Sequence, residues 1–298
     1  MDLHLTPNLF SVVIPTLNEG AMLEMTVTSI LNETSYPSFE IVIVDDGSID
    51  GSCDLYVDAV DPRIRLVRTG GCGVARARNL GACQAHGEFV VFLDAHCRVS
   101  SNWLDEFRIA LDEPDVAVVG PCFTRLDSSH PRGCGVTWRD YTLDQVWFEP
   151  CDSHSFYAVP LTPGGCQALR REMFSTMGRY ESGFTRWGSE DVELCLRAWL
   201  MGFQVMVCPK AVVAHHFRES RNFQVCDKDI LFNFLRMIHM HFTPSRIRLV
   251  LKEIRHNPYI EEALDRLYET DIFELRRSFA SRRKYTDDWF FSEICDFA

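Results

Sequence analysis

A short apolar run that leads directly into two ligand-type side chains constrains the fold of this chain more than any other feature. Residues 88–96 read Glu-Phe-Val-Val-Phe-Leu-Asp-Ala-His. The apolar residues 89–93 predict a strand covered on both faces, as in a parallel sheet. Because side chains alternate along a strand, Asp94 and His96 project to the same side. Ligands of open α/β sheets bind beyond the carboxyl ends of the strands, so we predict that these side chains hold a divalent cation. The structural alternative is that Asp94 caps the next helix and His96 is a loop residue.

Strand and helix patterns alternate on both sides of this run. Strands are predicted at residues 10–15, 40–45, 64–68, 116–120 and 203–209, and helices at 21–32, 51–60, 74–83, 101–111, 171–177 and 192–200. This alternation indicates an α/β fold with a mostly parallel sheet and helices on both faces. Residues 121–163 show no period and are expected to form an insertion that binds an acceptor. Helical patterns at 226–241, 244–255, 259–268 and 271–284 predict a C-terminal helical extension, so we expect domains at 1–218 and 219–298.

Two of the predicted helices carry, at their N-termini, polar residues of types suited to ligand binding or catalysis. Residues 70–73, Gly-Gly-Cys-Gly, open a helix on which Arg76 and Asn79 share a face, and such a start suits an anion. Glu190 and Asp191 occupy the first turn of a strongly amphipathic helix, with Ser189 as the expected N-cap. By default, acidic residues at this position only complement the helix dipole.

Composition excludes several classes of protein. The net charge of −12 argues against general nucleic-acid binding, and no apolar run approaches the ~20 residues of a transmembrane helix. The N-terminal residues lack the pattern of a signal peptide, so we expect a cytoplasmic protein. The twelve cysteines include no Cys-x-x-Cys pair, and we expect free core thiols rather than a disulfide framework or a zinc site.

Four sequence blocks occur in an order that resembles one known family. They are Asp94-Ala95-His96, Gly164-Gly165, the block Trp187-Gly188-Ser189-Glu190-Asp191, and Ala214-His215-His216-Phe217-Arg218. Together they are similar to the polypeptide N-acetylgalactosaminyltransferases, within the broad family-2 group of GT-A fold glycosyltransferases. The resemblance covers roughly residues 9–220.

The resemblance implies a UDP-sugar donor and a divalent metal, Mn²⁺ or Mg²⁺. The metal would be held by Asp94, His96 and His215; alignment of the following Phe-Arg pair favours His215 over His216. Oxygen and imidazole ligands without thiolate suit Mn²⁺ better than structural zinc. The residues implied to bind the donor are Pro15, Thr16, Asn18, Glu19, Asp45, Asp46, Arg76, Asp94, Ala95, Gly165 and Trp187. Without the resemblance, Asp45 and Asp46 would be read as turn formers.

The same resemblance implies catalysis from the acidic helix start. The N-acetylgalactosaminyltransferases usually carry Asn where this chain has Asp191, and a Glu-Asp pair is more similar to inverting enzymes of family 2. We therefore expect inversion, with Asp191 as general base beside Glu190 and ionised by the helix N-terminus; retention stays open. The acceptor, whether peptide, glycan or small molecule, is not identified, and a homo-oligomer through the helical tail is a further expectation. Alternatives are a sugar-1-phosphate nucleotidyltransferase, whose expected Gly-rich loop after the first strand is missing, and a non-catalytic nucleotide-sugar binding protein.

Overall fold

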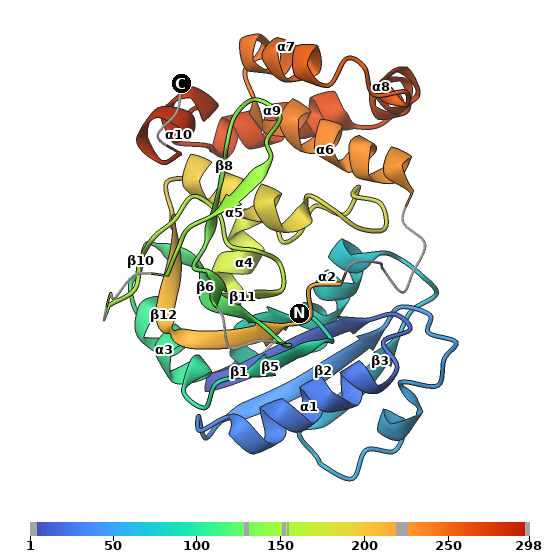
Figure 1. Ribbon diagram of the computed structural model, residues 1–298, viewed down its shortest axis with the longest axis vertical. Coiled ribbons are helices and arrows are strands. Elements are labelled where there is room, and N and C mark those ends of the chain that lie inside the picture. Colours follow the sequence, from blue (N-terminus) through green and yellow to red (C-terminus); the bar gives the residue numbers. More distant parts are fainter. Residues whose placement is uncertain (1–4, 128–130, 151–152, 154, 219–225, 296–298) are drawn as a thin grey trace.

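The computed structural model describes residues 5–127, 131–150, 153, 155–218 and 226–295. In this part of the chain, ten strands form one twisted sheet, with helices packed on both faces (Figure 1). The strands are β1 Thr6–Thr16, β2 Phe39–Asp45, β3 Ile64–Arg68, β4 Gly87–Leu93, β5 Cys97–Val99, β6 Val116–Arg125, β7 Pro131–Gly133, β10 Tyr157–Ala158, β11 Cys166–Arg170 and β12 Gln204–His215. β8 Val136–Trp138 and β9 Gln145–Trp147 form a separate pair. The expected α/β class is confirmed.

The sheet consists of two parallel groups of strands with the antiparallel strand β11 between them, and the short strands β5, β7 and β10 also pair antiparallel at its margins. Its order is β10-β12-β6-β11-β4-β1-β2-β3; β4, β1, β2 and β3 run parallel, as do β6 and β12. β11 lies antiparallel between β4 and β6. Because Cys166 pairs with Leu93, the residue before β11 meets the residue after β4, and the Asp94 N–H donates to the Gly165 carbonyl at 3.0 Å. The reversed strand thus brings the Gly164-Gly165 block to the end of the metal-motif strand.

Two apolar cores lie on opposite faces of the sheet, as the alternation of side chains requires. On β1, Val12 and Ile14 belong to the core that α1 Ala21–Glu33 and α3 Trp103–Leu111 cover. Val13 faces the other core, which is covered by α2 Val74–Gln84, α4 Arg171–Met177 and α5 Glu190–Leu200. The extension adds α6 Asp227–His241, α7 Pro244–Glu253, α8 Ile260–Tyr268, α9 Ile272–Arg282 and α10 Asp287–Glu293 above this second core (Figure 1).

The predicted lengths of one helix and two strands were wrong, and one helix was not predicted. The helix expected at residues 51–60 is only a 3-10 turn, η1 Asp54–Tyr56, and its apolar residues Leu55 and Val60 are 65% and 98% exposed, so no core supports a longer helix. β6 and β12 run well beyond the predicted strands because they pair with each other as far as Arg125 and His215. α10 was not predicted.

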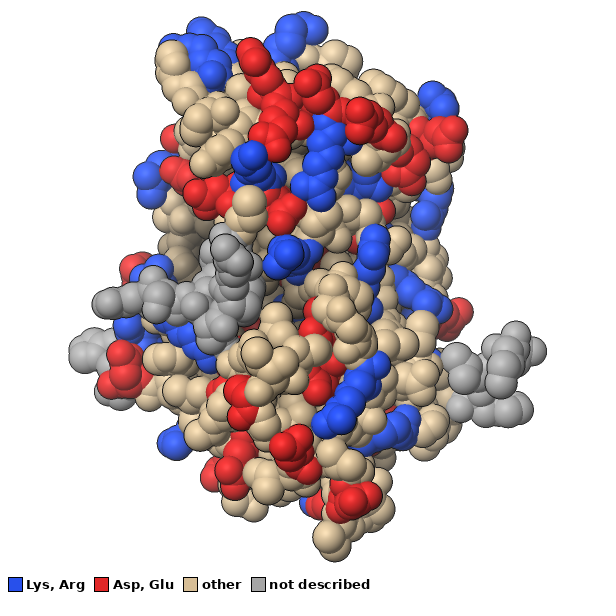
Figure 2. Space-filling model, turned by 90° about the vertical axis from the view of Figure 1, so that its right-hand side faces the viewer, with Lys and Arg blue, Asp and Glu red and all other residues tan. Residues whose placement is uncertain are grey.

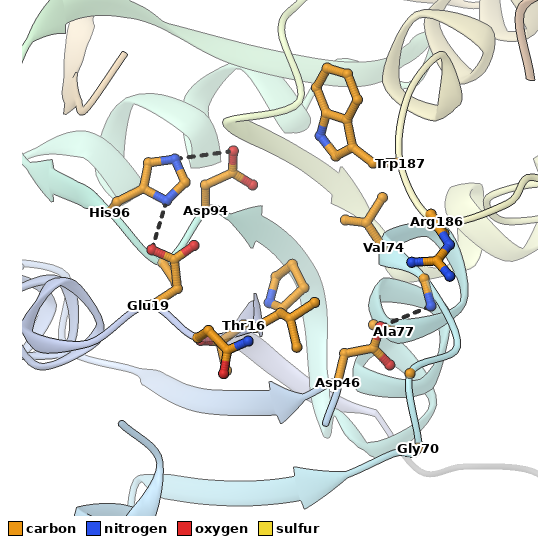
Figure 3. A pocket seen from close by; sticks show the side chains of 16 residues that line it. Thr16, Glu19, Asp46, Gly70, Val74, Ala77, Asp94, His96, Arg186 and Trp187 are labelled. Atoms are coloured by element: carbon orange, nitrogen blue, oxygen red, sulfur yellow. Dashed lines mark hydrogen bonds and ion pairs between the residues drawn. The ribbon is translucent and has the colours of Figure 1, made fainter. Parts of the chain in front are cut away.

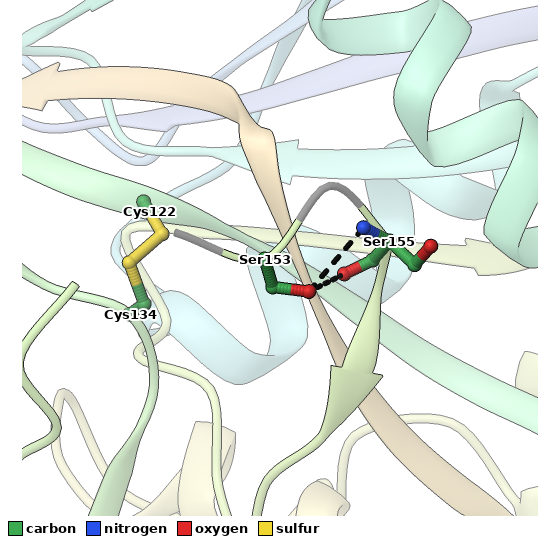
Figure 4. Close-up of a disulfide and its surroundings, with 4 residues drawn as sticks. All are labelled: Cys122, Cys134, Ser153 and Ser155. Atoms are coloured by element: carbon green, nitrogen blue, oxygen red, sulfur yellow. Dashed lines mark hydrogen bonds between the residues drawn. A yellow bond between two sulfur atoms is a disulfide. The ribbon is translucent and has the colours of Figure 1, made fainter. Parts of the chain in front are cut away.

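The expectation of free cysteines was wrong for one pair. Cys122 on β6 and Cys134 after β7 form a disulfide (Figure 4). The antiparallel pairing of β6 with β7 sets Phe123 opposite Gly133 and so brings the two cysteines together. This contact belongs to the irregular segment 121–163, where the sequence shows no period from which the pairing could be predicted. Among the described residues, no helix is long and apolar enough to cross a bilayer.

Candidate active site

A pocket of about 600 Å³ lies beyond the carboxyl ends of β1, β2 and β4. This is where an open α/β sheet binds its ligands, because the loops that follow neighbouring strands diverge there. Figure 3 shows Glu19, Asp94 and His96 on one side and Arg186 and Trp187 on the other. The predicted residues that line the pocket are Pro15, Thr16, Asn18, Glu19, Asp46, Asp94, Ala95, His96 and Trp187.

The three predicted metal ligands come together at the edge of this pocket. One potential ligand atom from each of Asp94, His96 and His215 lies within 4.8 Å of the others. His215 Nε2 is 3.4 Å from Asp94 Oδ2, and His96 Nε2 is 4.0 Å from the same oxygen. The antiparallel pairing of β12 with β5 sets His215 opposite Cys97 and so delivers it beside His96. His216 instead donates its backbone N–H to the His96 carbonyl at 3.1 Å. The geometry therefore favours His215 over His216.

The chemistry of this triad fits a divalent cation with oxygen and nitrogen preference. Burial, only partly offset by the hydrogen bond to Asp94, lowers the pKa of His215, so this imidazole is neutral, which is the form that binds metal. Cys97 and Cys166 lie near Asp94, but burial raises the pKa of both thiols well above the ordinary value. They therefore stay protonated and do not convert the triad into a thiolate site.

Glu19 supports the triad from the side. Its Oε2 is 3.3 Å from His96 Nδ1, and Arg218 pairs with the same carboxylate. Burial acts to raise the pKa of Glu19, but the hydrogen bonds and charges of His96 and Arg218 outweigh it and hold the pKa below the ordinary value. A charged carboxylate on Nδ1 orients an imidazole so that Nε2 is left to bind a metal.

Arg78 connects the metal triad to the acidic helix start. Its side chain is 3% exposed, with Nη2 3.1 Å from Asp94 Oδ1 and Nη1 2.8 Å from Glu190 Oε1. It also donates to the Gly164 carbonyl at 2.9 Å. Burial alone would raise the pKa of Asp94, but the His215 hydrogen bond and the Arg78 charge hold it well below its usual range. His215 and Arg78 together therefore keep Asp94 ionised.

The two members of the acidic pair at the start of α5 differ in setting: Glu190 is buried, and Asp191 is half-buried. Burial and the charge of Asp191 raise the pKa of Glu190 to about 7, against the opposing effect of Arg78. Asp191 Oδ2 accepts the Gly164 N–H at 2.7 Å, yet burial raises its pKa as well. The expectation was that the helix N-terminus keeps Asp191 ionised; desolvation opposes this effect, because it raises the pKa of the carboxyl. Ser189 stands at the N-cap position, but its side chain caps no N–H.

Asp45 and Asp46 play different parts at the end of β2. Asp45 is buried outside the pocket lining, where its Oδ1 accepts the Ser48 N–H at 2.7 Å. Asp46 lines the pocket, and its carboxylate accepts the N–H groups of Cys72 and Gly73 at 2.7 and 2.8 Å. Asp46 thus fixes the glycine-rich loop to the end of β2, and the Asp46 side chain also borders the pocket (Figure 3).

Several predicted residues lie outside the pocket lining. Arg76 is exposed and donates through Nε to the Ser182 carbonyl at 2.7 Å, so the structure does not bring it to this pocket. Gly165 lies directly behind the triad, where a Cβ atom would stand 2.9 Å from His215 Cδ2. Glu190 and Asp191 lie next to the pocket and are joined to it through Arg78 and Gly164.

Sequence reasoning missed Arg78 and Arg186. Arg78 shares the buried face of α2 with Ala75, Gly81 and Ala82, and this pattern of small residues at helical spacing could have identified it instead of Arg76. Among the described residues that line the pocket, Arg186 is the one with a basic side chain. No local pattern distinguishes it, because it lies in a loop whose path depends on contacts with other elements.

Comparisons with known proteins agree with this geometry. The model of glycosyl transferase family 2 matches residues 11–178, and that of the N-terminal domain of galactosyltransferase matches residues 151–220. The inactive polypeptide N-acetylgalactosaminyltransferase-like protein 5 of Macaca fascicularis is 30% identical over 247 residues, which cover 76% of this chain and 56% of that relative. Polypeptide N-acetylgalactosaminyltransferase 11 of Xenopus tropicalis is 33% identical over 232 residues, or 71% of this chain and 38% of the relative. The chain thus spans roughly half or less of the length of these curated relatives.

Solved structures show the same fold. The crystal structure of GalNAc-T7 with UDP, GalNAc and Mn²⁺ matches 97% of this chain and 56% of that chain, with a TM-score of 0.78 at 24% identity. The mannosyltransferase PcManGT from Pyrobaculum calidifontis, in complex with GDP-Man and Mn²⁺, matches 95% of this chain with a TM-score of 0.56 at 20% identity. Because the family-2 model covers more than half of the 298 residues, and the strands and pocket have the arrangement described above, the chain belongs to glycosyl transferase family 2.

Proposed function

We propose that this protein is a metal-dependent glycosyltransferase that transfers a sugar from a UDP-sugar to an acceptor, with inversion at the anomeric carbon. The observation that carries the proposal is the convergence of Asp94, His96 and His215 at the edge of a pocket of about 600 Å³, next to the carboxylate pair at the start of α5. The UDP and Mn²⁺ named for GalNAc-T7 support the choice of donor and metal. The acceptor is a peptide, a glycan or a small molecule.

In this proposal one group of residues stabilises the leaving diphosphate, and another takes the proton of the acceptor. A bound Mn²⁺ or Mg²⁺ would neutralise charge on the leaving diphosphate, and Asp94, His96 and His215 would hold it. Arg78 adds a fixed positive charge behind Asp94. Asp191, held by the Gly164 N–H, would take the proton of the acceptor hydroxyl as that oxygen attacks the anomeric carbon.

Calorimetry of UDP binding with and without Mn²⁺ tests this proposal. We expect Mn²⁺ to strengthen UDP binding to the wild-type protein, because the triad and the diphosphate would share the cation. His215→Ala should weaken this Mn²⁺ effect more than His216→Ala, since the His215 ring lies 3.4 Å from Asp94, whereas His216 contacts this region through its backbone N–H. UDP binding that is the same with and without Mn²⁺ would refute the metal-dependent mechanism, and a larger effect at His216 would reverse the ligand assignment.

Turnover assays separate the enzyme from its alternatives. One of the relatives named above is described as inactive, so UDP binding alone does not establish transfer. Screening UDP-sugars for Mn²⁺-dependent hydrolysis identifies the donor sugar, and anomeric NMR of a transfer product distinguishes inversion from retention. Binding without hydrolysis or transfer would support the non-catalytic nucleotide-sugar binding protein instead.

The cytoplasmic location and the homo-oligomer stay predictions. Disulfides are rare in cytosolic proteins, so the bond between Cys122 and Cys134 argues for an oxidising compartment and against the cytoplasmic expectation.

The segment that carries this bond, together with β8 and β9, is the region that we propose to select the acceptor.

A further inference from the structure

The wall of the pocket opposite the metal triad is a loop with an unfavourable backbone. Residues 185–189 precede α5, and Arg186, Gly188 and Ser189 have positive φ angles of 48°, 111° and 71°. The left-handed region disfavours side chains, so non-glycine residues stay there only where surrounding contacts hold them. Arg186 and Trp187 of this loop line the pocket (Figure 3). The position of the wall therefore depends on what holds the loop from outside.

A single buried side chain of the helical extension makes several of the hydrogen bonds that fix the backbone of this loop. Asn233 lies on α6 and is 0% exposed. Its Oδ1 accepts the Thr185 N–H at 2.8 Å, and its Nδ2 donates to the carbonyls of Thr185, Trp187 and Gly188 at 2.8, 3.1 and 3.1 Å. The two hydrogens of the amide thus serve three carbonyls. Without this amide, those carbonyls would be left without that donor in a largely buried place, which is costly.

Two further contacts complete the attachment of the loop. On the side of the extension, Asp229 of α6 is 3.5 Å from Arg186 Nε and accepts the Thr185 hydroxyl at 3.2 Å. On the side of the sheet, the Val74 N–H donates to the Arg186 carbonyl at 2.8 Å, so the loop is fixed to the start of α2. The loop is therefore held between the helical extension and the glycine-rich loop of the pocket.

We propose that Asn233 is a positioning residue for the donor site: through the 185–188 backbone it places Arg186 and Trp187, and so makes the helical extension part of the UDP-sugar pocket. This inference rests on the proposed function. It assigns to the extension a role in donor binding that differs from covering an edge or from assembly. Asn233 is not itself among the residues that line the pocket, and it acts through the loop.

The test compares two substitutions on the same helix in the full chain. Asn233→Ala removes the amide, and His239→Ala is the control: His239 is also buried on α6, but its ring contacts Leu235 and Tyr268 and not the loop. Hydrogen–deuterium exchange of the peptide containing residues 183–189 reports on the loop. Calorimetry with UDP and Mn²⁺ reports on the site, at a temperature where both variants are folded.

We expect the loop amides to exchange about tenfold faster in Asn233→Ala than in the wild type, and the dissociation constant for UDP to rise about tenfold. His239→Ala should leave both within about twofold. If Asn233→Ala does not accumulate as folded protein, Asp229→Asn takes its place, and we expect a change of about threefold in the same directions.

Two results would overturn the inference: unchanged exchange of the loop, or faster exchange with unchanged affinity for UDP. The second result would leave the proposed function intact and show that the loop does not set donor affinity. Wild-type protein that does not bind UDP with Mn²⁺ would overturn the proposed function and the assignment of Asn233 to a donor site with it. The exchange data would still show separately whether Asn233 holds the loop.

Discussion

At the scale of single residues, the site is a set of buried charges that compensate one another. Arg78 lies between Asp94 and Glu190, and removing either carboxylate would leave the buried Arg78 guanidinium with one ion pair instead of two, which is costly. The carboxylate of Asp191 is instead held by backbone N–H groups, among them that of Gly164 at 2.7 Å. On this difference we base the proposal that Asp191, rather than Glu190, exchanges a proton with the acceptor.

Asp191→Asn should therefore nearly abolish transfer while leaving the affinity for UDP within a few-fold of the wild type. Asparagine keeps the size of the side chain and can still accept the Gly164 N–H, but it cannot take the proton of an acceptor hydroxyl. Steady-state transfer rates and calorimetry with UDP provide the two measurements. If transfer survives in this variant, the base is another group.

Glu190 should make the protein less stable as the pH rises. The unfolded carboxyl ionises near its ordinary pKa of 4.5, whereas the folded pKa is raised to about 7. Between these values the folded state holds a proton that the unfolded state has lost, so the contribution of Glu190 to stability is complete below pH 4.5 and is lost as the pH rises to about 7. Glu190→Gln cannot titrate.

We therefore expect the free energy of unfolding of Glu190→Gln, relative to the wild type, to increase across this pH range. Urea denaturation at several pH values measures the difference directly. The loss of the Arg78 ion pair adds a contribution as well, but the trend with pH identifies the raised pKa. A difference that does not change with pH would show that Glu190 ionises normally in the folded protein.

At the scale of elements, the pocket is made where loops that follow parallel strands come into contact. The loop after β3 is held to Asp46 at the end of β2, and its last residue, Gly73, stands at the N-cap position just before α2. Gly73 has a φ of 90°, and a Cβ atom there would stand 2.9 Å from the Arg186 backbone N. Close packing of two backbones thus explains why glycine is needed at this position.

Gly73→Ala should destabilise the protein by about 1–3 kcal/mol, because both the backbone angle and the contact with Arg186 oppose a side chain. Gly70→Ala is the matched control in the same loop, since a Cβ atom at Gly70 meets nothing within 4 Å. Its effect should stay within about 0.5 kcal/mol. Denaturant unfolding of both variants makes the comparison, and equal losses of stability would show that the loops can separate at little cost.

At the scale of the whole molecule, the helical extension and the sheet share one apolar core. Val13 and Val42 of the sheet belong to the same buried cluster as Leu235, Ile238 and Phe291 of the extension. A buried network reinforces this contact: Glu193 of α5 is 2.7 Å from His241 Nε2 of α6 and 2.7 Å from Arg197. The boundary predicted at residue 218 lies next to residues outside the described part of the chain, and it stays a prediction.

We expect the two predicted domains to unfold in one transition, because separating them would expose the cluster that both share. Native-state hydrogen exchange at increasing urea concentrations can compare amides of β1 with amides of α6. The most protected amides of both elements should show the same free energy of opening. A lower value for α6 alone would indicate that the extension opens as an independent unit.

The strands β1, β2 and β4 and the residues at their ends could be predicted from the sequence for one physical reason. A strand buried on both faces is a continuous apolar run, and parallel strands place the residues that follow them at the same edge. Asp46, Asp94 and His96 lie at that edge as expected. The order of the later blocks, read as a family resemblance, added His215 and the acidic pair.

The remaining features depend on contacts between residues far apart in the chain. Whether Arg76 or Arg78 enters the site depends on which face of α2 packs on the sheet, and the Cys122–Cys134 bond depends on the pairing of β6 with β7. The raised pKa of Glu190 follows from the burial of α5, and the hydrogen bonds of Asn233 to the pocket wall follow from the docking of α6.

The sequence by itself thus determined where the strands end and which ligand types stand there, because those properties are local. Only the tertiary structure decided which charges are buried together and which loops are held in place, because desolvation and packing depend on neighbours that the chain brings together when it folds.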